Sequence, residues 1–247
     1  MSRLPWLADN APPEALPPAH SARDEPNGLL AVGGSLDPDW LLHAYAHGAF
    51  PWYNPGEPIL WWSPDPRAVL RPDELRISRS LRRRIRSGTF DIRADTQFSA
   101  VIEACAGPRD QGDGTWITKQ MKSAYLRLHA LGYAHCFEAW QGKQLVGGLY
   151  GVALGSVFFG ESMFAHADDA SKVAFSSAVG FLRSRGVALI DCQIPSEHLR
   201  SLGATLMRRE AFLAELDTLC ASVRSPGAWT EDFEHWYGSQ QNEQIRA

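Results

Sequence analysis

Residues 134–162 read AHCFEAWQGKQLVGGLYGVALGSVFFGES, three mostly apolar runs that are separated near Gly142 and Gly155. Short apolar runs divided by glycine predict consecutive antiparallel strands. The next segment, SKVAFSSAVGFLRSRG at 171–186, predicts a helix that ends in a glycine, and VALIDCQI at 187–194 predicts one more strand. This half of the chain is therefore expected to form three strands, a helix and a fourth strand.

Two helices are expected before these strands. Apolar residues share one helical face in DTQFSAVIEACAG (95–107) and again in ITKQMKSAYLRLHALG (117–132). The order helix, helix, three strands, helix, strand predicts an α/β or α+β domain around a central mixed sheet. Gcn5-related acetyltransferases have this order too, a similarity of fold that by itself implies no function.

The N-terminal part of the chain has a different character. Residues 1–27 hold six of the sixteen prolines and predict an irregular lead-in. DPDWLLHAYAHG (37–48) predicts a short helix with Asp37 as its N-cap, and FPWYNPGEPILWWSPDPR (50–67) predicts ordered loop and short strand. We therefore expect a small N-terminal domain over 1–67 and a larger, acetyltransferase-like domain over 68–247.

Composition limits the function classes. The chain has 247 residues, 45% of them hydrophobic, with a formal net charge of −4, as in an ordinary globular protein. No apolar run approaches the ~18–20 residues of a membrane helix, and the N-terminus lacks the apolar segment of a secretory signal. The cysteines are too far apart for a C-x-x-C pair, which favours a reduced, cytoplasmic location; they are Cys105, Cys136, Cys192 and Cys220.

Cofactor motifs are lacking in the sequence. The eight histidines show no metal-ligand spacing, and no Walker loop, nucleophile elbow or dinucleotide fingerprint occurs, so no metal and no cofactor are expected. Residues 109–114 match the R-x-x-G-x-G pattern of a coenzyme A loop, but the match follows a helix and carries two aspartates. The place where the fold would need that loop, 161–172, contains no glycine. We interpret 109–114 as a surface loop.

A basic run lies at 76–86, RISRSLRRRIR, with six arginines and no acidic residue. A local basic face on an acidic protein suits contact with phosphates, because binding depends on local counterion release. A solvated helix face is the alternative.

Asp191-Cys192-Gln193 ends the last predicted strand. Because alternate residues of a strand point the same way, Asp191 and Gln193 are expected to project together and Cys192 to point away. Polar groups on a buried strand are costly unless they are paired or functional, and a structural pair is the alternative to a site. A glutamine is not a useful base, but it can orient an amine or polarise a carbonyl.

Glu161 follows the strand SVFFG and is expected where that strand gives way to a loop, a position that often faces a cleft. A solvent-exposed or salt-bridged carboxylate is the alternative. Met163 and Phe164 come next, and they belong either to the core or to a pocket, since methionine adapts to differently shaped apolar groups.

Together these residues resemble the leucyl/phenylalanyl-tRNA–protein transferase family. The resemblance rests on the segment from Gly28 to Leu70, GLLAVGGSLDPDWLLHAYAHGAFPWYNPGEPILWWSPDPRAVL, and on WITKQM, FFGESMF, ASKVAF, DCQ and HLRSLGA. It extends to about Leu216. It implies a small N-terminal domain joined to an acetyltransferase-like one, an aminoacyl-tRNA donor that carries Leu or Phe and less readily Met, and an acceptor protein that begins with Arg or Lys. The product would be marked for N-end-rule degradation.

The resemblance also implies roles for individual residues. Asp191, Gln193 and Glu161 become the catalytic candidates: Gln193 orients the amine or the ester carbonyl, Asp191 holds Gln193 or relays a proton, and Glu161 attracts the cationic N-terminus of the acceptor. The arginines of the basic run would face tRNA, namely Arg79, Arg82, Arg83, Arg84 and Arg86. An apolar, adaptable pocket would hold the donor side chain, lined by Trp52, Trp116, Tyr125, Phe158, Met163, Phe175 and Ile190.

Other functions remain open at this stage. An N-acyltransferase that uses acyl-coenzyme A would need a working pyrophosphate loop, and a non-catalytic tRNA-binding module would leave the three polar candidates unexplained. A peptidoglycan-type aminoacyl-tRNA ligase would need a larger, duplicated domain. Nothing in the sequence demands more than a monomer.

Overall fold

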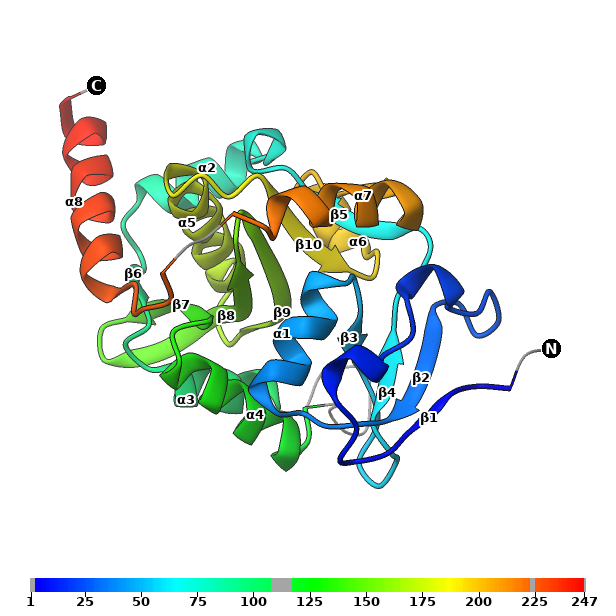
Figure 1. Ribbon diagram of the computed structural model, residues 1–247. Coiled ribbons are helices and arrows are strands. Elements are labelled where there is room, and N and C mark those ends of the chain that lie inside the picture. Colours follow the sequence, from blue (N-terminus) through cyan, green and yellow to red (C-terminus); the bar gives the residue numbers. More distant parts are fainter. Residues whose placement is uncertain (1–2, 108–116, 223–224, 247) are drawn as a thin grey trace.

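The computed structural model describes residues 3–107, 117–222 and 225–246, and Figure 1 shows how they are arranged. Two β-sheets form, one of four strands and one of seven, and helices pack around them. The predicted α/β class with a central mixed sheet is confirmed. Among the residues described, none of the helices combines the length and the apolarity that crossing a bilayer requires.

The small sheet contains only strands from the N-terminal part of the chain. Its order is β1 (Trp6–Leu7), β2 (Leu29–Gly33), β4 (Leu60–Trp62) and β3 (Phe50–Pro51). β1 lies parallel to β2, so the proline-rich lead-in is less irregular than predicted. Helix α1 (Pro38–Ala46) begins after Asp37 as predicted, and Gly48 follows its end with φ 79°, a conformation that favours glycine.

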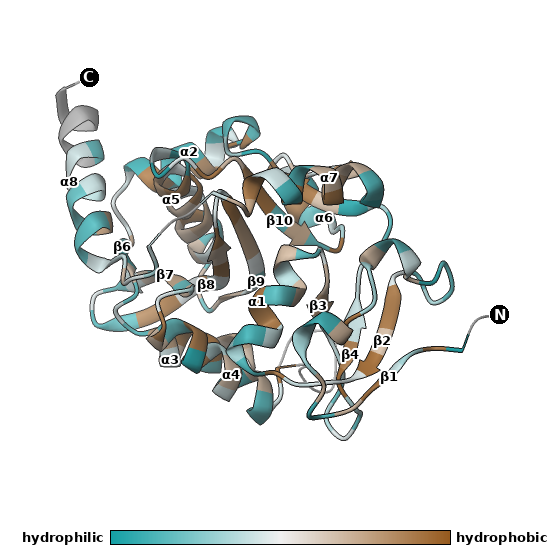
Figure 2. Cartoon of the chain, in the orientation of Figure 1, coloured by the Kyte–Doolittle hydropathy of each residue, from teal (hydrophilic) through white to brown (hydrophobic). Residues whose placement is uncertain are grey.

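The large sheet carries the three predicted antiparallel strands at its centre. In sheet order the strands are β11 (Thr205–Met207), β5 (Arg67–Leu70), β10 (Leu189–Gln193), β9 (Val157–Ala165), β8 (Gln144–Leu154), β7 (Ala134–Gln141) and β6 (Asp91–Ala94). β7, β8 and β9 are antiparallel neighbours, whereas β9 and β10 run parallel. Figure 2 shows β8, β9 and β10 as strongly apolar, as expected for strands covered on both faces.

Helices cover both faces of the large sheet. α3 (Phe98–Cys105) and α4 (Lys119–Ala130) pack on one face together with α1, and α5 (Ala170–Ser184) packs on the other, next to α2 (Arg79–Arg86) and α8 (Thr230–Arg246). Gly147 allows α5 to approach β8 closely, because a Cβ at this position would lie 2.6 Å from the Cβ of Ala170. The remaining helices, α6 (Glu197–Ser201) and α7 (Arg209–Leu219), flank β11 in the chain.

One hydrophobic core connects the two sheets. Tyr45 of α1 is fully buried and packs on Phe159 of β9, with ring centroids 4.9 Å apart. The same core includes Trp61 of the small sheet and Tyr125 of α4. The strands divide between the two sheets just before Arg67, at the predicted boundary, but the division into domains 1–67 and 68–247 stays a prediction.

Candidate active site

Neighbouring irregularities in β9 and β10 open a gap in the large sheet. The two strands pair only from Leu189 to Asp191. In β9 the register with β8 shifts so that Glu161 is an extra residue, and in β10 the register with β5 shifts between Asp191 and Gln193. Gln193 also adopts φ 61°. β-Bulges bend a strand and redirect its side chains, so β9 and β10 separate beyond the pair of Asp191 and Phe159, while β9 stays paired with β8.

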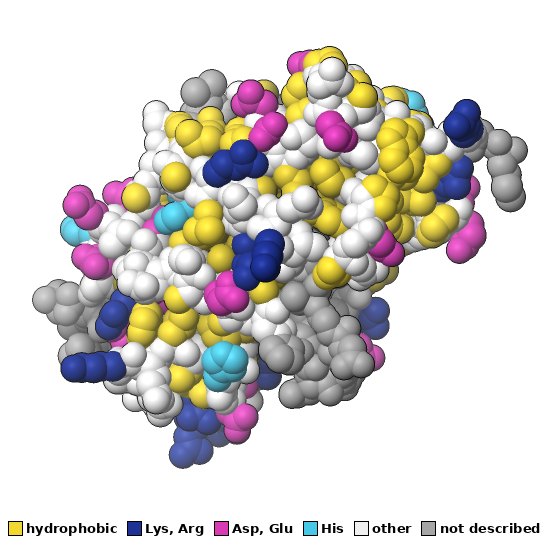
Figure 3. All heavy atoms as spheres, turned by 90° about the horizontal axis from the view of Figure 1, so that it is seen from below, with side chains coloured by type: hydrophobic (Ala, Val, Ile, Leu, Met, Phe, Trp, Pro, Cys, Tyr) yellow, Lys and Arg dark blue, Asp and Glu magenta, His cyan; other side chains and the backbone are white. Residues whose placement is uncertain are grey.

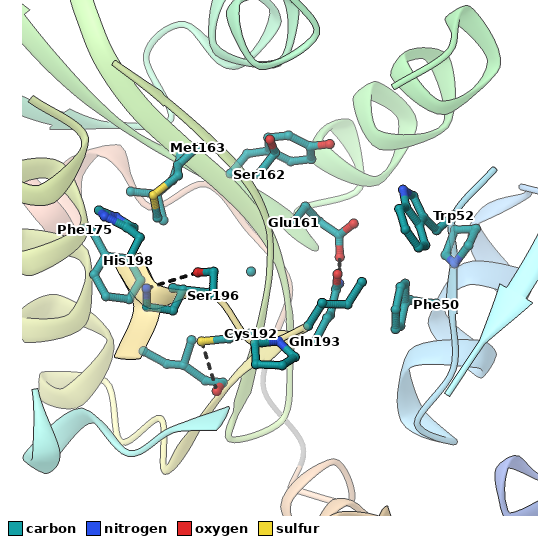
Figure 4. Close-up of a pocket in the computed structure, with 18 residues that line it drawn as sticks. Phe50, Trp52, Glu161, Ser162, Met163, Phe175, Cys192, Gln193, Ser196 and His198 are labelled. Carbon is teal, nitrogen blue, oxygen red and sulfur yellow. Dashed lines mark hydrogen bonds between the residues drawn. The ribbon is translucent and has the colours of Figure 1, made fainter. Parts of the chain in front are cut away.

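A pocket of about 360 Å³ occupies this gap. Figure 4 shows two sides: Glu161 faces Trp52 and Phe50, whereas Met163, Phe175 and His198 gather on the other side. Its apolar wall is completed by residues of the central strands, Leu149 and Ile190. The volume and the mostly apolar lining are typical of a small-molecule site.

Glu161 is the centre of a hydrogen-bond network at the polar side of the pocket. Tyr45 Oη donates to Glu161 Oε1 over 2.7 Å, and Tyr125 Oη donates to Oε2 over 2.7 Å. Gln193 Nε2 donates to Oε1 over 2.8 Å. The two tyrosine hydroxyl oxygens lie 2.5 Å apart. Two helices and one strand, which are distant from one another in the sequence, thus fix the orientation of one carboxyl group.

Burial raises the pKa of Glu161 from 4.5 to about 7. The hydrogen bonds from Tyr125 and Tyr45 favour the ionised form and oppose this shift, while the nearby charge of Asp191 adds to it. Burial and the charge of Glu161 in turn raise the pKa of both tyrosines well above 10, so their hydroxyl groups remain hydrogen-bond donors. A carboxyl group that titrates near neutrality suits proton transfer.

Asp191 lies behind the pocket in a fully buried ion pair. Arg67 donates from Nε to Asp191 Oδ1 over 2.8 Å and from Nη2 to Oδ2 over 2.6 Å, and neither side chain is exposed. The guanidinium group lies between the rings of Phe50 and Phe212, 4.7 Å from each centroid. Asp191 Oδ1 also accepts a hydrogen bond from the backbone nitrogen of Gln193, which fixes the bulge.

Two local expectations are wrong. Cys192 does not point away from Gln193: both line the pocket, whereas Asp191 does not, because the bulge interrupts the alternation of the strand. Glu161 does not end its strand either, since β9 continues to Ala165 through the bulge.

The predicted pocket residues take different positions. Trp52, Met163, Phe175 and Ile190 line the pocket. Tyr125 lies behind it and contacts Glu161, whereas Phe158 is buried in the core against Phe137 and Trp229. Trp116 and the 109–114 loop lie outside the residues that the structure describes.

Sequence reasoning missed Tyr45, Arg67 and several lining residues. Tyr45 belongs to an apolar helix face, and nothing in that pattern distinguishes a core tyrosine from one that holds a carboxylate. From the sequence, Arg67 marked only the end of the predicted N-terminal domain. The missed residues of the pocket wall include Phe50, Leu149, Tyr150, Cys192 and His198.

The predicted arginines form one basic surface on α2. Ser78 caps this helix by accepting a hydrogen bond from the backbone nitrogen of Leu81, whose side chain anchors the helix in the core. Within the described part of the chain, none of these arginines has an ion-pair partner; they are Arg79, Arg82, Arg83, Arg84 and Arg86. On the face that Figure 3 shows, acidic and basic side chains are interspersed instead.

The fold and the pocket define an α/β protein in which an apolar wall meets a carboxyl group that titrates near neutrality. The family model of the leucyl/phenylalanyl-tRNA protein transferase N-terminal domain matches residues 34–65, and the model of leucyl/phenylalanyl-tRNA protein transferase matches residues 69–217. The chain belongs to this family.

Curated relatives agree. Leucyl/phenylalanyl-tRNA–protein transferase of Azoarcus sp. is 54% identical over 227 residues, 92% of this chain and 95% of the relative. The enzyme so named of Stutzerimonas stutzeri is 59% identical over 82% of this chain and 89% of its own length. That of Pseudomonas paraeruginosa is 60% identical over 79% of this chain and 87% of its own length. A GCN5-related N-acetyltransferase of Kribbella flavida is similar over 69% of this chain and 61% of its own, with 11% identity and a TM-score of 0.38, too low to support an inference.

Proposed function

We propose that this protein transfers Leu or Phe, and less readily Met, from aminoacyl-tRNA to the N-terminal Arg or Lys of acceptor proteins. The observation that carries the proposal is the pocket, in which an apolar wall lies beside the network of Glu161 and Gln193. The family match supports this function over an acyl-coenzyme A transferase or a non-catalytic tRNA-binding module. The protein would act in the cytoplasm as a monomer, without a cofactor, and its products would enter N-end-rule degradation.

The two sides of the pocket suit the two substrates. The donor side chain would lie against Leu149, Met163 and Phe175, and an apolar wall that contains a methionine tolerates both Leu and Phe. The cationic N-terminus of the acceptor would lie at Glu161, the carboxyl group that the pocket exposes. The terminal adenosine of tRNA would stack on Trp52, a residue that lines the pocket and is 39% exposed.

The chemistry needs alignment more than activation. The ester that links the amino acid to the tRNA ribose is already reactive, so an enzyme gains most by placing the amine against the ester carbon. Gln193 would orient the amine or the carbonyl. Asp191, whose charge is paired with Arg67, would act as a positioning residue that holds the backbone of Gln193.

We expect labelled leucine to move from Leu-tRNA to a peptide that begins with Arg and not to the same peptide that begins with Ala. Gln193→Ala should slow the transfer about 100-fold, as the loss of one preorganised donor does in other enzymes. Gln144→Ala removes an exposed glutamine at the start of β8 and should leave the rate unchanged. Radiolabel in the recovered peptides measures the rate.

Equal labelling of both peptides would contradict the acceptor specificity. Labelling of neither peptide, with tRNA bound, would contradict the transferase function and favour the binding module.

Replacing Arg82 and Arg83 with glutamine should weaken binding of Leu-tRNA and Phe-tRNA alike. Each lost phosphate contact reduces the slope of log K against log salt concentration by roughly 0.7–0.9, so the double variant should lose about 1.5. Filter binding between low and physiological salt measures this slope.

A matched control removes two cations from α4. Lys122 and Arg127 form ion pairs with Glu103 and Asp37, and Lys122→Gln/Arg127→Gln should leave the slope unchanged. Equal slopes in the two double variants would exclude α2 as the tRNA surface.

A further inference from the structure

Glu161, Tyr45 and Tyr125 form a closed ring of three short contacts. Tyr45 Oη lies 2.7 Å from Glu161 Oε1, Tyr125 Oη lies 2.7 Å from Oε2, and the two hydroxyl oxygens lie 2.5 Å apart. Both tyrosine side chains are fully buried. The two tyrosine hydroxyl groups are therefore shielded from bulk water, and only Glu161 of the ring reaches the pocket.

The ring lacks one hydrogen when Glu161 is ionised. Each tyrosine hydroxyl carries one hydrogen, and an ionised carboxylate carries none. With Glu161 ionised, both hydrogens point to the carboxylate, and the two hydroxyl oxygens face each other at 2.5 Å without a hydrogen between them. One further proton completes the ring: Oε2–H donates to Tyr125, Tyr125 to Tyr45, and Tyr45 to Oε1.

The other neighbours of Glu161 favour Oε2 as the place for this proton. Gln193 Nε2, from β10, already donates to Oε1, so Oε1 accepts two hydrogen bonds and Oε2 accepts one. The charge of Asp191, also on β10, raises the proton affinity of Glu161, although Arg67 is paired with it. Tyr150 of β8 lies near both ring tyrosines and adds to the rise of their pKa.

We propose that Glu161, held by Tyr45 and Tyr125, is the base that takes a proton from the α-ammonium group of the acceptor. The proposal rests on the transferase function proposed above. Tyr45 and Tyr125 are positioning residues, because they act through Glu161 and do not line the pocket.

The step balances in protons and electrons. One N–H bond of the ammonium group breaks, its proton goes to Glu161 Oε2, and the freed lone pair attacks the ester carbon. The C–N bond forms, the C–O bond to the ribose breaks, and a second proton passes from the nitrogen to the ribose oxygen. Glu161 then releases its proton to solvent. A free α-amino group has a pKa of ~7.7–8.0, so a base with a pKa of about 7 receives its proton at little cost.

The test measures the pKa of the Glu161 carboxyl group directly and compares it with the pH dependence of the transfer rate. The infrared C=O band of protonated Glu161, identified as the band that Glu161→Gln lacks, should titrate near pH 7. In the pH profile of kcat/KM for the Arg peptide, the acidic limb should have its midpoint at the same pH. Tyr125→Phe removes a donor to the ionised carboxylate and also the acceptor of the Oε2–H group in the protonated ring. Charge-assisted hydrogen bonds are about twice as strong as neutral ones, so the loss to the ionised form is the larger one. The titration midpoint of the infrared band and the midpoint of the acidic limb should therefore both rise by about one pH unit.

Tyr133→Phe is the matched control, because Tyr133 lies outside the pocket and should change neither value. If the midpoint of the acidic limb differs from the titration midpoint of the infrared band, the base role is overturned and the transferase function stays intact. No transfer by the wild-type protein at any pH would overturn the function and the base role with it. If Tyr125→Phe does not fold, Tyr45→Phe and the coincidence of the wild-type band with the wild-type limb decide.

Discussion

Arg67→Met is expected to lower the free energy of unfolding by about 3–5 kcal/mol at pH 7. The variant would leave Asp191 as an unpaired charge in a place where neither partner is exposed. Methionine fills much of the space between Phe50 and Phe212, so the loss measures the missing cation more than a cavity. Urea unfolding followed by circular dichroism measures the difference.

Two further variants separate the charge from other effects. In Arg67→Met/Asp191→Asn the asparagine is neutral and still accepts the hydrogen bond from the Gln193 backbone, so most of the stability should return. Arg71→Met breaks a pair of the same chemistry with Glu215, 2.7 Å long but partly exposed, and should cost less than about 1 kcal/mol. Similar losses at Arg67 and Arg71 would show that burial does not matter to the first pair.

Glu161→Gln is expected to make the protein more stable at pH 8.5 and far less active. The folded protein holds the Glu161 proton up to about pH 7, whereas an ordinary glutamate gives it up near 4.5. Because the folded pKa is raised, this group stabilises the fold below pH 4.5, and the contribution is lost as the pH rises to 7. Glutamine keeps the neutral hydrogen-bond pattern of the protonated ring at every pH.

The expected gain in unfolding free energy at pH 8.5 is about 1–3 kcal/mol, and it should vanish near pH 5. Transfer to the Arg peptide should fall about 10²–10⁴-fold, the usual contribution of a positioned base. Thermal unfolding at both pH values and the peptide assay measure the two effects. Glu103→Gln, at an exposed site, should change neither. A variant that is less stable at pH 8.5 would contradict a proton-holding ring.

Local patterns predicted the elements of the fold well. The helix at 38–46 and the strand sequence from 134 to 165 have clear apolar spacing, and glycines or a proline mark their ends. Glu161 and Gln193 were also identified as polar residues on otherwise apolar strands. These signals are local, because each depends on residues that are only a few positions apart in the sequence.

The remainder of the site depends on contacts that no local pattern encodes. Arg67 pairs with a residue 124 positions away, and Tyr45 bonds one 116 positions away. The bulge at Cys192 reverses the direction that strand alternation predicts, since one extra residue shifts the facing of every side chain after it.

The buried position of Tyr45 also limits how this chain can change over generations. The N-terminal segment supplies Tyr45, Phe50 and Trp52, while the rest of the chain supplies Glu161 and Gln193. The segment looks modular in sequence, but its energy and its chemistry are not separable from the remainder. A segment exchanged with a distant relative would have to fit α4, the carboxyl group of Glu161 and the Arg67–Asp191 ion pair at once. Exchange of the N-terminal segment alone is therefore expected to disrupt the site.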